Sequence, residues 1–419
     1  MITQTFLSLE LKPNRNYKEI KTVVGESGFA TGAFKVPTPK RVRIVPPYLF
    51  AEIDRAREAV KARGVDVISL GIGDPDANTP EEIVEELIAA SRVGQNQKYP
   101  KYLGTPAFKE AVADFYKRRY DVDLEPVTET MCAIGSKEAI VHFILGVVDT
   151  SDYVLVPDPG YPAYEMGTHF AGGTPYMMPL TEENGFIPDL TRIPSDVAKK
   201  AVLMFINYPN NPTSAMAPIE FYREAVDFCR GYNIVIANDN AYSEVYHDEP
   251  PPSILQIPGA RELAIEFNSL SKTFNMTGWR VGYVAGGKKL IHNLEIIKTN
   301  IDSGVFTAIQ IAAVKALRMP LNQADGLRKM YWDRRKLVER RLKEKGYYFF
   351  ASTGTFYVWV KTPGGRPSLE YCAKLLNETG VVCGPGRGWG EHGEGWFRIC
   401  LTVEDDRMNE ALDRIFKFG

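Results

Sequence analysis

The 419-residue sequence has few cysteines, few histidines and little excess of charge of either sign. Its five cysteines are widely scattered, with no C-x-x-C pair and no spacing typical of a metal site. Unclustered thiols of odd number are typical of a reducing cytoplasm, where we expect the protein to reside. The five histidines form no H-E-x-x-H pair, so no metal ion is expected.

Long apolar runs, basic blocks and a nucleotide-binding glycine motif are also missing. No apolar run reaches the roughly 20 residues of a membrane span, and the N-terminus lacks the pattern of a secretory signal. An organellar transit peptide stays open there, although three early glutamates argue against one. The formal net charge of −2 argues against a nucleic-acid partner. "GIGDPD" (71–76) lacks the third glycine of a dinucleotide site, which argues against a nicotinamide-dependent oxidoreductase, and a P-loop is absent.

What the sequence does contain is an alternation of strand and helix patterns. Near-continuous apolar runs indicate strands buried on both faces, at 67–73, 131–135, 153–158, 201–207, 233–239, 263–269 and 279–286. Helical patterns occur at 48–63, 81–93, 106–119, 137–148 and 219–230. This order predicts an α/β fold with a mostly parallel sheet covered by helices.

The pattern changes after about residue 305, where a long helical region (322–346) leads to three short strands and two more helices. These features predict a second, smaller α+β domain. We therefore expect four parts: an N-terminal arm (1–44), the N-terminal part of the small domain with a linker (45–75), a large cofactor-binding domain (76–304) and a small C-terminal domain (305–419).

Polar residues follow the ends of several predicted strands, where open parallel sheets bind ligands. Gly135, Ser136 and Lys137 precede a helix, and free N–H groups at that helix start, with a serine cap, would form an anion site. The residues that follow the later strands are Tyr161, Asn211, Asp239, Tyr242, Ser269 and Lys272, with Arg280 in the last one.

Each of these residues also has an ordinary structural interpretation. Asn-Pro and Asp-Pro pairs form turns, Tyr161 alone is more often a packed aromatic, Asp239 could cap a helix, and Lys272 could be a loop lysine. Together, however, the residues supply an anion cradle, an aromatic plate, an amide, a carboxylate, a phenol, an amine and a guanidinium. That set suits a phosphorylated aromatic carbonyl cofactor held as a Schiff base.

From about residue 40 onward, the chain resembles the class I/II aminotransferases of pyridoxal-phosphate fold type I. The resemblance lies in "SLSKTFNMTGWRVGY" (269–283), "NYPNNPTS" (207–214), "DNAYSEV" (239–245) and "WFRICL" (396–401). Within that family, "VPPYLFAEIDRAR", "ISLGIGDPD" and "NIDSGVF" resemble the LL-diaminopimelate aminotransferase group.

The resemblance implies pyridoxal 5′-phosphate as cofactor and gives catalytic roles to three residues. Lys272 would bind the cofactor covalently and shuttle the proton, Asp239 would pair with the pyridine N–H, and Tyr161 would stack on the ring. Asn211 and Tyr242 would hydrogen-bond the ring's phenolic oxygen.

The phosphate would be held by Ser269, Arg280 and the turn formed by Gly135, Ser136 and Lys137, with Tyr99 reaching over from a neighbouring subunit. Ser303, a candidate substrate-binding residue, lies in another segment that would cross between subunits, so a homodimer with shared active sites is implied.

Amino acids and 2-oxo acids would be the substrates. Arg398 would clamp the α-carboxylate, with Asn211 beside it and a backbone N–H of Gly73. Tyr48 and Lys137 match substrate-side positions of the diaminopimelate group. One departure is Tyr102, which stands in a loop where plant members carry an acidic residue.

The expected reaction is amino transfer between LL-2,6-diaminopimelate and 2-oxoglutarate, a step of lysine biosynthesis, giving tetrahydrodipicolinate by cyclisation. Alternatives are a general alanine or aspartate aminotransferase and a carbon–sulfur lyase on the same scaffold. A non-enzymatic regulator is disfavoured, since the 44-residue arm is short and insufficiently basic for a winged helix.

Overall fold

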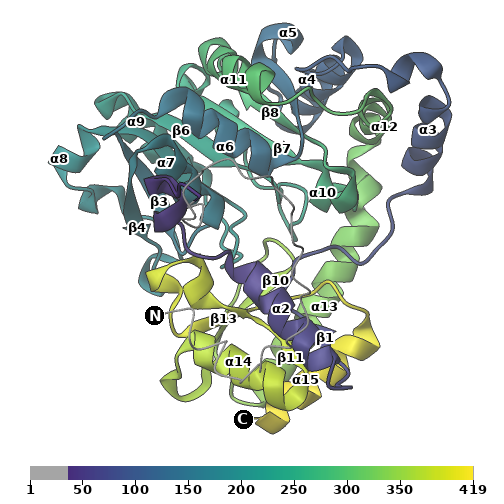
Figure 1. Ribbon diagram of the computed structural model, residues 1–419, viewed down its shortest axis with the longest axis vertical. Helices are drawn as coiled ribbons and strands as arrows, with labels where there is room; N and C mark the ends of the chain where they lie inside the picture. The colour runs from purple at the N-terminus through teal and green to yellow at the C-terminus, as the bar shows by residue number, and fades with distance from the viewer. Residues whose placement is uncertain (1–35, 419) are drawn as a thin grey trace, which may run out of the picture.

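The computed structural model describes residues 36–418, so most of the predicted N-terminal arm lies outside the described residues. A large α/β part forms the upper half of the molecule in Figure 1, and a smaller α+β part forms the lower half. Within residues 36–418, no helix combines the length and apolarity that a bilayer crossing requires.

A seven-stranded sheet organises the large part, in the order β2-β8-β7-β6-β5-β3-β4. All neighbouring pairs are parallel except those of β8, which runs antiparallel to both β2 and β7. The predicted, mostly parallel sheet is therefore confirmed. Its strands are β2 (Thr130–Ala133), β3 (Tyr153–Asp158), β4 (Thr174–Pro179), β5 (Ala201–Ile206), β6 (Val235–Asp239), β7 (Ala264–Ser269) and β8 (Gly282–Gly286).

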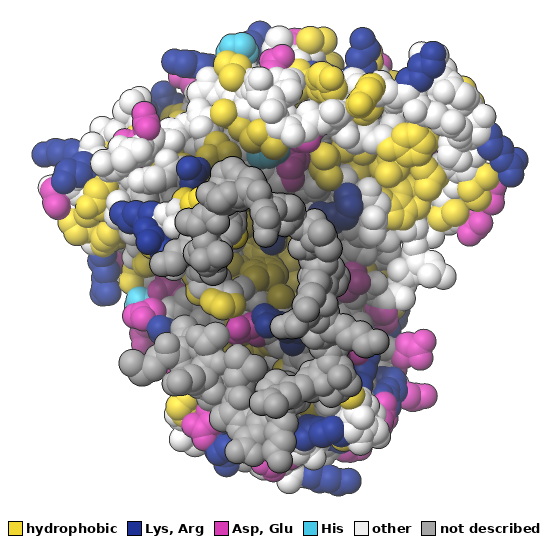
Figure 2. Space-filling view, in the orientation of Figure 1, with side chains coloured by type: hydrophobic (Ala, Val, Ile, Leu, Met, Phe, Trp, Pro, Cys, Tyr) yellow, Lys and Arg dark blue, Asp and Glu magenta, His cyan; other side chains and the backbone are white. Residues whose placement is uncertain are grey.

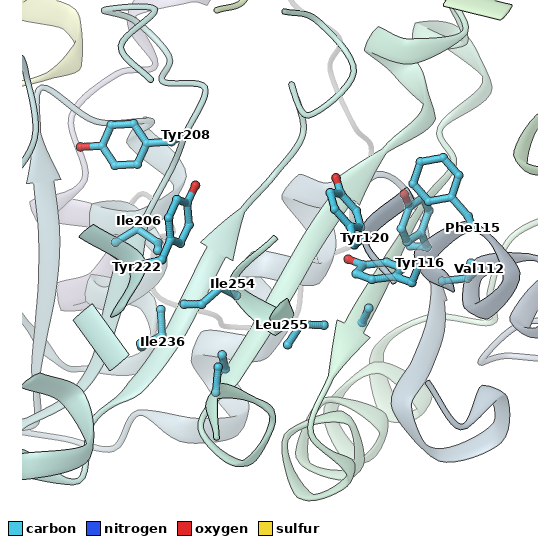
Figure 3. Packing of buried hydrophobic residues seen from close by; sticks show 14 of the residues in the cluster. Val112, Phe115, Tyr116, Tyr120, Ile206, Tyr208, Tyr222, Ile236, Ile254 and Leu255 are labelled. Atoms are coloured by element: carbon cyan, nitrogen blue, oxygen red, sulfur yellow. The ribbon is translucent and has the colours of Figure 1, made fainter. Parts of the chain in front are cut away.

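Helices cover both faces of this sheet because both faces are apolar. Along β5, Leu203 and Phe205 pack on one face, while Met204 and Ile206 pack on the other. The first face carries α6 (Ser136–Val147), α7 (Pro162–Ala171) and α11 (Lys288–Ile301), and the second carries α4 (Pro106–Tyr120), α9 (Ile219–Tyr232) and α12 (Thr307–Arg318). Figure 3 shows the second core, where aromatic rings of α4 and α9 lie against the sheet.

The smaller part is built on an antiparallel sheet in the order β12-β13-β10-β9. A separate parallel pair joins β1 to β11. The strands are β1 (Ile68–Ser69), β9 (Phe349–Phe350), β10 (Tyr357–Lys361), β11 (Val381–Val382), β12 (Gly384–Pro385) and β13 (Trp396–Cys400). The helices are α2 (Leu49–Lys61), α13 (Asp325–Glu344), α14 (Ser368–Thr379) and α15 (Asp405–Phe418).

Short helices complete the chain: α1 (Lys40–Ile44), α3 (Glu81–Ser91), α5 (Pro126–Glu129), α8 (Ser195–Ala198) and α10 (Leu270–Thr273). Helix α12 follows the predicted boundary at residue 304, yet it packs on α3 and α4 of the large part. The exact domain bounds therefore stay a prediction.

Candidate active site

The polar residues predicted at the strand ends lie at one edge of the large sheet, where it faces the smaller part. Asp239 ends β6, and Lys272 lies in α10 directly after β7. Arg398, on β13 of the smaller part, donates from Nη1 to Asn211 Oδ1 across 2.6 Å. The two parts of the chain therefore contribute to the same site.

Lys272 has an almost buried environment and one close partner. Its Nζ donates to the backbone oxygen of Gly73 across 2.9 Å. Burial lowers the pKa of the amine to about 8, although the nearby Asp74 carboxylate opposes this. Gly73 also packs so tightly against the Tyr357 hydroxyl that a side chain there would clash.

Asp239 is a buried carboxylate with one satisfied oxygen. The Tyr164 hydroxyl donates to Oδ2 across 2.7 Å, and the Tyr164 ring stacks on Phe205 at 4.5 Å. Oδ1 has no hydrogen-bond partner among residues 36–418. Burial raises the pKa of Asp239 to about 6. The residues after Asp239 form turns rather than a helix, so helix capping does not explain this carboxylate.

The guanidinium of Arg398 lies between two aromatic rings. The guanidinium carbon lies 4.0 Å from the centroid of Tyr357 and 4.4 Å from that of Trp389. Nη2 donates to the backbone oxygen of Gly71, while Nε has no hydrogen-bond partner within the described part of the chain. A planar cation held in this way suits a carboxylate ligand.

Tyr357, Trp389 and Tyr164 are residues of the site that the sequence did not predict. The hydroxyl groups of Tyr357 and Tyr242 also form a hydrogen bond, with 2.6 Å between their oxygens. The strand β10 pairs with β13 so that Trp359 faces Arg398, which makes Tyr357 the diagonal neighbour of Arg398 on the same face. Only the register of this pairing could have revealed that relation.

The segment predicted to bind an anion lies at the start of α6, and one expectation about it was wrong. Gly135 is the N-cap residue, with φ +75°, and Ser136 is the first helical residue, so the expected serine cap was wrong. Only glycine adopts this φ easily, and a side chain at Gly135 would clash with the Arg280 guanidinium. Arg280 and Gly135 therefore pack together, and Ser269 caps the neighbouring α10.

Tyr48, Lys137 and Tyr161 lie close together at the entrance to the site. The Lys137 ammonium is 4.5 Å from the Tyr48 ring centroid and 5.9 Å from that of Tyr161. Burial lowers the pKa of Lys137 and raises that of Tyr161. A cavity of about 430 Å³ is lined by Tyr48 and Tyr161, together with Phe50, Glu165 and Trp389. Lys137 does not line it, and neither does Lys272, Asp239 or Arg398.

Tyr99, Tyr102 and Ser303 do not join the other residues. The Tyr99 side chain is 86% exposed, Tyr102 is 44% exposed, and Ser303 is also exposed. Hydrophobic side chains gather at the upper right of Figure 2, over the region of α3 and α12 in Figure 1. Exposed apolar residues there include Ile88 on α3, Val93 shortly after α3 and Phe306 directly before α12.

Chemically, the site joins an amine of lowered pKa, a buried carboxylate, free N–H groups at a helix start and a fixed guanidinium. The amine can form a covalent bond to a carbonyl carbon or accept a proton. Oδ1 of Asp239, which has no partner among residues 36–418, can accept a hydrogen bond from a cationic ring nitrogen. Arg398 can bind an acid, and the cradle can bind a phosphate.

Comparison with known proteins identifies one family. The family model described as aminotransferase class I and II matches residues 65–415. A protein of Aquifex aeolicus named LL-diaminopimelate aminotransferase is 54% identical, over 90% of this chain and 97% of its own length. A protein of the same name from Moorella thermoacetica is 49% identical, over 90% of this chain and 97% of its own length.

Solved structures agree with this similarity. Substrate-bound BacF from Bacillus subtilis superposes with a TM-score of 0.89 at 35% identity, covering 92% of this chain and 98% of its own. An aspartate aminotransferase mutant from Thermus thermophilus has a TM-score of 0.86 at 26% identity, covering 92% and 100%.

Proposed function

Because this chain belongs to the aminotransferase class I and II family and is an aminotransferase, we propose that it uses pyridoxal 5′-phosphate to move an amino group from LL-2,6-diaminopimelate to 2-oxoglutarate. The observation that carries the cofactor assignment is Asp239 Oδ1, a buried oxygen with no hydrogen-bond partner among residues 36–418, on the same sheet edge as the nearly buried Lys272 amine. A buried polar atom without a partner is unfavourable unless a ligand completes it.

The residues present fit this cofactor. Lys272 would bind its aldehyde carbon, and Asp239 would accept from its pyridine N–H. The Gly135–Lys137 turn with Ser269 and Arg280 would hold its phosphate, while Tyr161 would stack on its ring. When bound, the cofactor supplies an aldehyde that takes up the amino group and a ring that withdraws electrons from the substrate Cα.

Lys272 has two tasks in this reaction. Near pH 8 about half of the amine is neutral, because burial lowers its pKa to about 8. The neutral Nζ can attack a carbonyl carbon, whereas an ordinary lysine is mostly protonated at that pH. Once released, the same Nζ is a base that can take the proton from the substrate Cα.

Arg398 orients the substrate. Its fixed plane presents parallel N–H donors to the α-carboxylate. Asn211 Oδ1 accepts from Nη1, which fixes the rotation of the guanidinium. The substrate acid and the reacting amine are thereby oriented by different parts of the fold.

The substrate assignment comes from similarity and from the entrance of the site. Two relatives at 54% and 49% identity bear the name LL-diaminopimelate aminotransferase. Diaminopimelate carries a second amino acid head, which needs polar partners away from Arg398. Tyr48 lines the cavity, the Lys137 ammonium lies 4.5 Å from the centroid of its ring, and both side chains can supply such partners. Glutamate could use Lys137 for its side-chain carboxylate.

The cytoplasmic location of the protein stays a prediction.

The substrate prediction is tested by steady-state kinetics with 2-oxoglutarate as acceptor. We expect kcat/KM for LL-diaminopimelate to exceed that for alanine or aspartate by at least tenfold, a margin of about 1.4 kcal/mol in transition-state binding. The meso isomer and aromatic amino acids serve as matched donors of similar size.

A tenfold advantage for alanine or aspartate would contradict the substrate and leave a general aminotransferase. Release of sulfide from a sulfur-containing amino acid at a comparable rate would instead indicate the lyase.

The proposal includes a homodimer, because Tyr99 is 86% exposed and its segment resembles the one that reaches a neighbouring subunit's cofactor in the family. We expect separately inactive Lys272→Ala and Tyr99→Ala variants to regain activity when mixed. A hybrid dimer has one site with both Lys272 and Tyr99 intact. Activity of the mixture, measured after subunit exchange, checks this.

The matched control mixes Lys272→Ala with Asp239→Asn. Both residues belong to the same subunit's site, so no hybrid contains an intact pair and no recovery is expected. Equal recovery in both mixtures, or full activity of a monomer in sedimentation, would refute shared sites.

A further inference from the structure

Four charged or titratable side chains form a largely buried group next to the Gly135–Lys137 turn at the start of α6. Glu138 and His142 lie on α6, and Lys298 and Asp302 lie at the end of α11, which packs beside α6 (Figure 1). The Lys298 side chain is fully buried, and the other three are between 11% and 18% exposed. None of these four has a role in the mechanism above.

Lys298 sits between the two carboxylates. Its Nζ is 3.2 Å from Glu138 Oε1 and 2.8 Å from Asp302 Oδ2. His142 Nδ1 lies 2.6 Å from the same Glu138 oxygen. The spacing of Glu138, His142 and Asp302 would also fit a metal ion, but the Lys298 ammonium already supplies the positive charge there.

Each carboxylate also holds a backbone amide. Glu138 Oε2 accepts from the N–H of Ile134 across 2.8 Å, directly before the Gly135–Lys137 turn. Asp302 Oδ1 accepts from the N–H of Gly304 across 2.7 Å. The charged group therefore joins two backbone segments that are more than 160 residues apart in the chain.

The second segment supports the loop that carries Tyr99 and Tyr102. Gly304 has φ +86°, and a Cβ there would lie 3.0 Å from the Cα and 3.1 Å from the backbone oxygen of Tyr102. The 99–104 loop thus rests directly on Gly304. A continuous set of contacts runs from Ile134 through Glu138, Lys298 and Asp302 to this loop.

We propose that Glu138, Lys298 and Asp302 are positioning residues that hold the Gly135–Lys137 turn and the 99–104 loop in a fixed relation to each other. The inference rests on the proposed function, which assigns the turn to a subunit's own cofactor phosphate and the loop to its partner's. Loss of the Lys298 charge leaves two buried carboxylates without their shared cation, so both segments lose support together.

Hydrogen exchange of the cofactor-free protein tests this directly. In Lys298→Met, we expect exchange to quicken about tenfold or more in peptides covering 130–137 and in those covering 99–104 and 302–306. Peptides from β5 and β6 should stay unchanged. Lys289→Met is the matched control, since Lys289 is an exposed lysine of the same helix, and should leave all of these peptides as they are.

Asp302→Asn provides a second variant that keeps an oxygen for the Gly304 amide but removes the charge. Exchange should again quicken in both the 130–137 and the 99–104 peptides, but by less. If Lys298→Met does not fold, this variant tests the proposal alone. Faster exchange confined to 298–306, or spread evenly over the whole chain, would overturn the proposal.

Cofactor affinity gives the second measurement. Titration with pyridoxal 5′-phosphate should show a Kd at least about tenfold higher for Lys298→Met than for Lys289→Met. A tenfold change in Kd corresponds to about 1.4 kcal/mol of binding free energy. An unchanged Kd would also overturn the positioning role. If the natural protein itself binds no cofactor, the proposed function fails, while the exchange pattern still decides whether the two segments share one support.

Discussion

Replacing Lys272 with alanine should lower kcat by about 10⁴-fold or more, because one side chain supplies both the covalent attachment and the proton transfer. The fold should persist, since alanine removes an amine that, within residues 36–418, hydrogen-bonds only to Gly73. Borohydride reduction of the cofactor-loaded natural protein, followed by peptide mapping, should place the phosphopyridoxyl group on Lys272.

The pH dependence gives this prediction a second arm. Burial lowers the pKa of Lys272 to about 8, so the neutral amine accumulates as the pH rises through 8. The rate at which cofactor-free protein takes up pyridoxal phosphate should therefore rise over that range, and Lys289→Met should behave identically. A modified lysine other than Lys272, or retained turnover in the alanine variant, would contradict the assignment.

Replacing Asp239 with asparagine should separate stability from activity. We expect turnover to fall by about 10²-fold or more, because the amide no longer favours the protonated ring nitrogen, and each pKa unit at that nitrogen corresponds to about 1.4 kcal/mol. Cofactor should still bind through Lys272 and the phosphate cradle. Steady-state kinetics and the absorbance of the bound cofactor measure both quantities.

Without cofactor, the Asp239→Asn variant should also be more stable than the natural protein above pH 6. Burial raises the pKa of Asp239 from 3.8 to about 6, so the folded state keeps this proton while the unfolded state loses it. Stability therefore falls as the pH rises from about 4 to 6 and stays lower beyond, by on the order of 2 to 3 kcal/mol. Asparagine has no such loss. Denaturant unfolding of both proteins at pH 5 and pH 8 measures this difference in the free energy of unfolding. If the variant turned over as fast as the natural protein, Asp239 would have only a structural role.

Much of the site could be predicted from the sequence because its residues end buried parallel strands. Asp239 and Lys272 directly follow apolar runs, and a parallel sheet brings such ends to one edge. The structure places them there, with the Arg398 strand facing them from the smaller part. The cofactor roles themselves stay a proposal.

Other features depended on contacts that no local pattern contains. The strand β4 was missed because its six residues include two prolines and it lies at the edge of the sheet. The predicted strand 67–73 is only Ile68–Ser69 and pairs with β11 rather than joining the large sheet. Tyr164 appears in the sequence as one of several tyrosines, and only tertiary packing brings its hydroxyl to Asp239.

The aromatic rings on either side of Arg398 also affect the entropy of substrate binding. A free arginine side chain has about 2 kcal/mol of rotamer entropy, and immobilising such a side chain on binding normally opposes association. Between Tyr357 and Trp389, with both terminal nitrogens already bonded, that freedom has been lost during folding. A substrate carboxylate therefore meets a guanidinium whose ordering it does not have to offset, and more of the interaction energy appears as affinity.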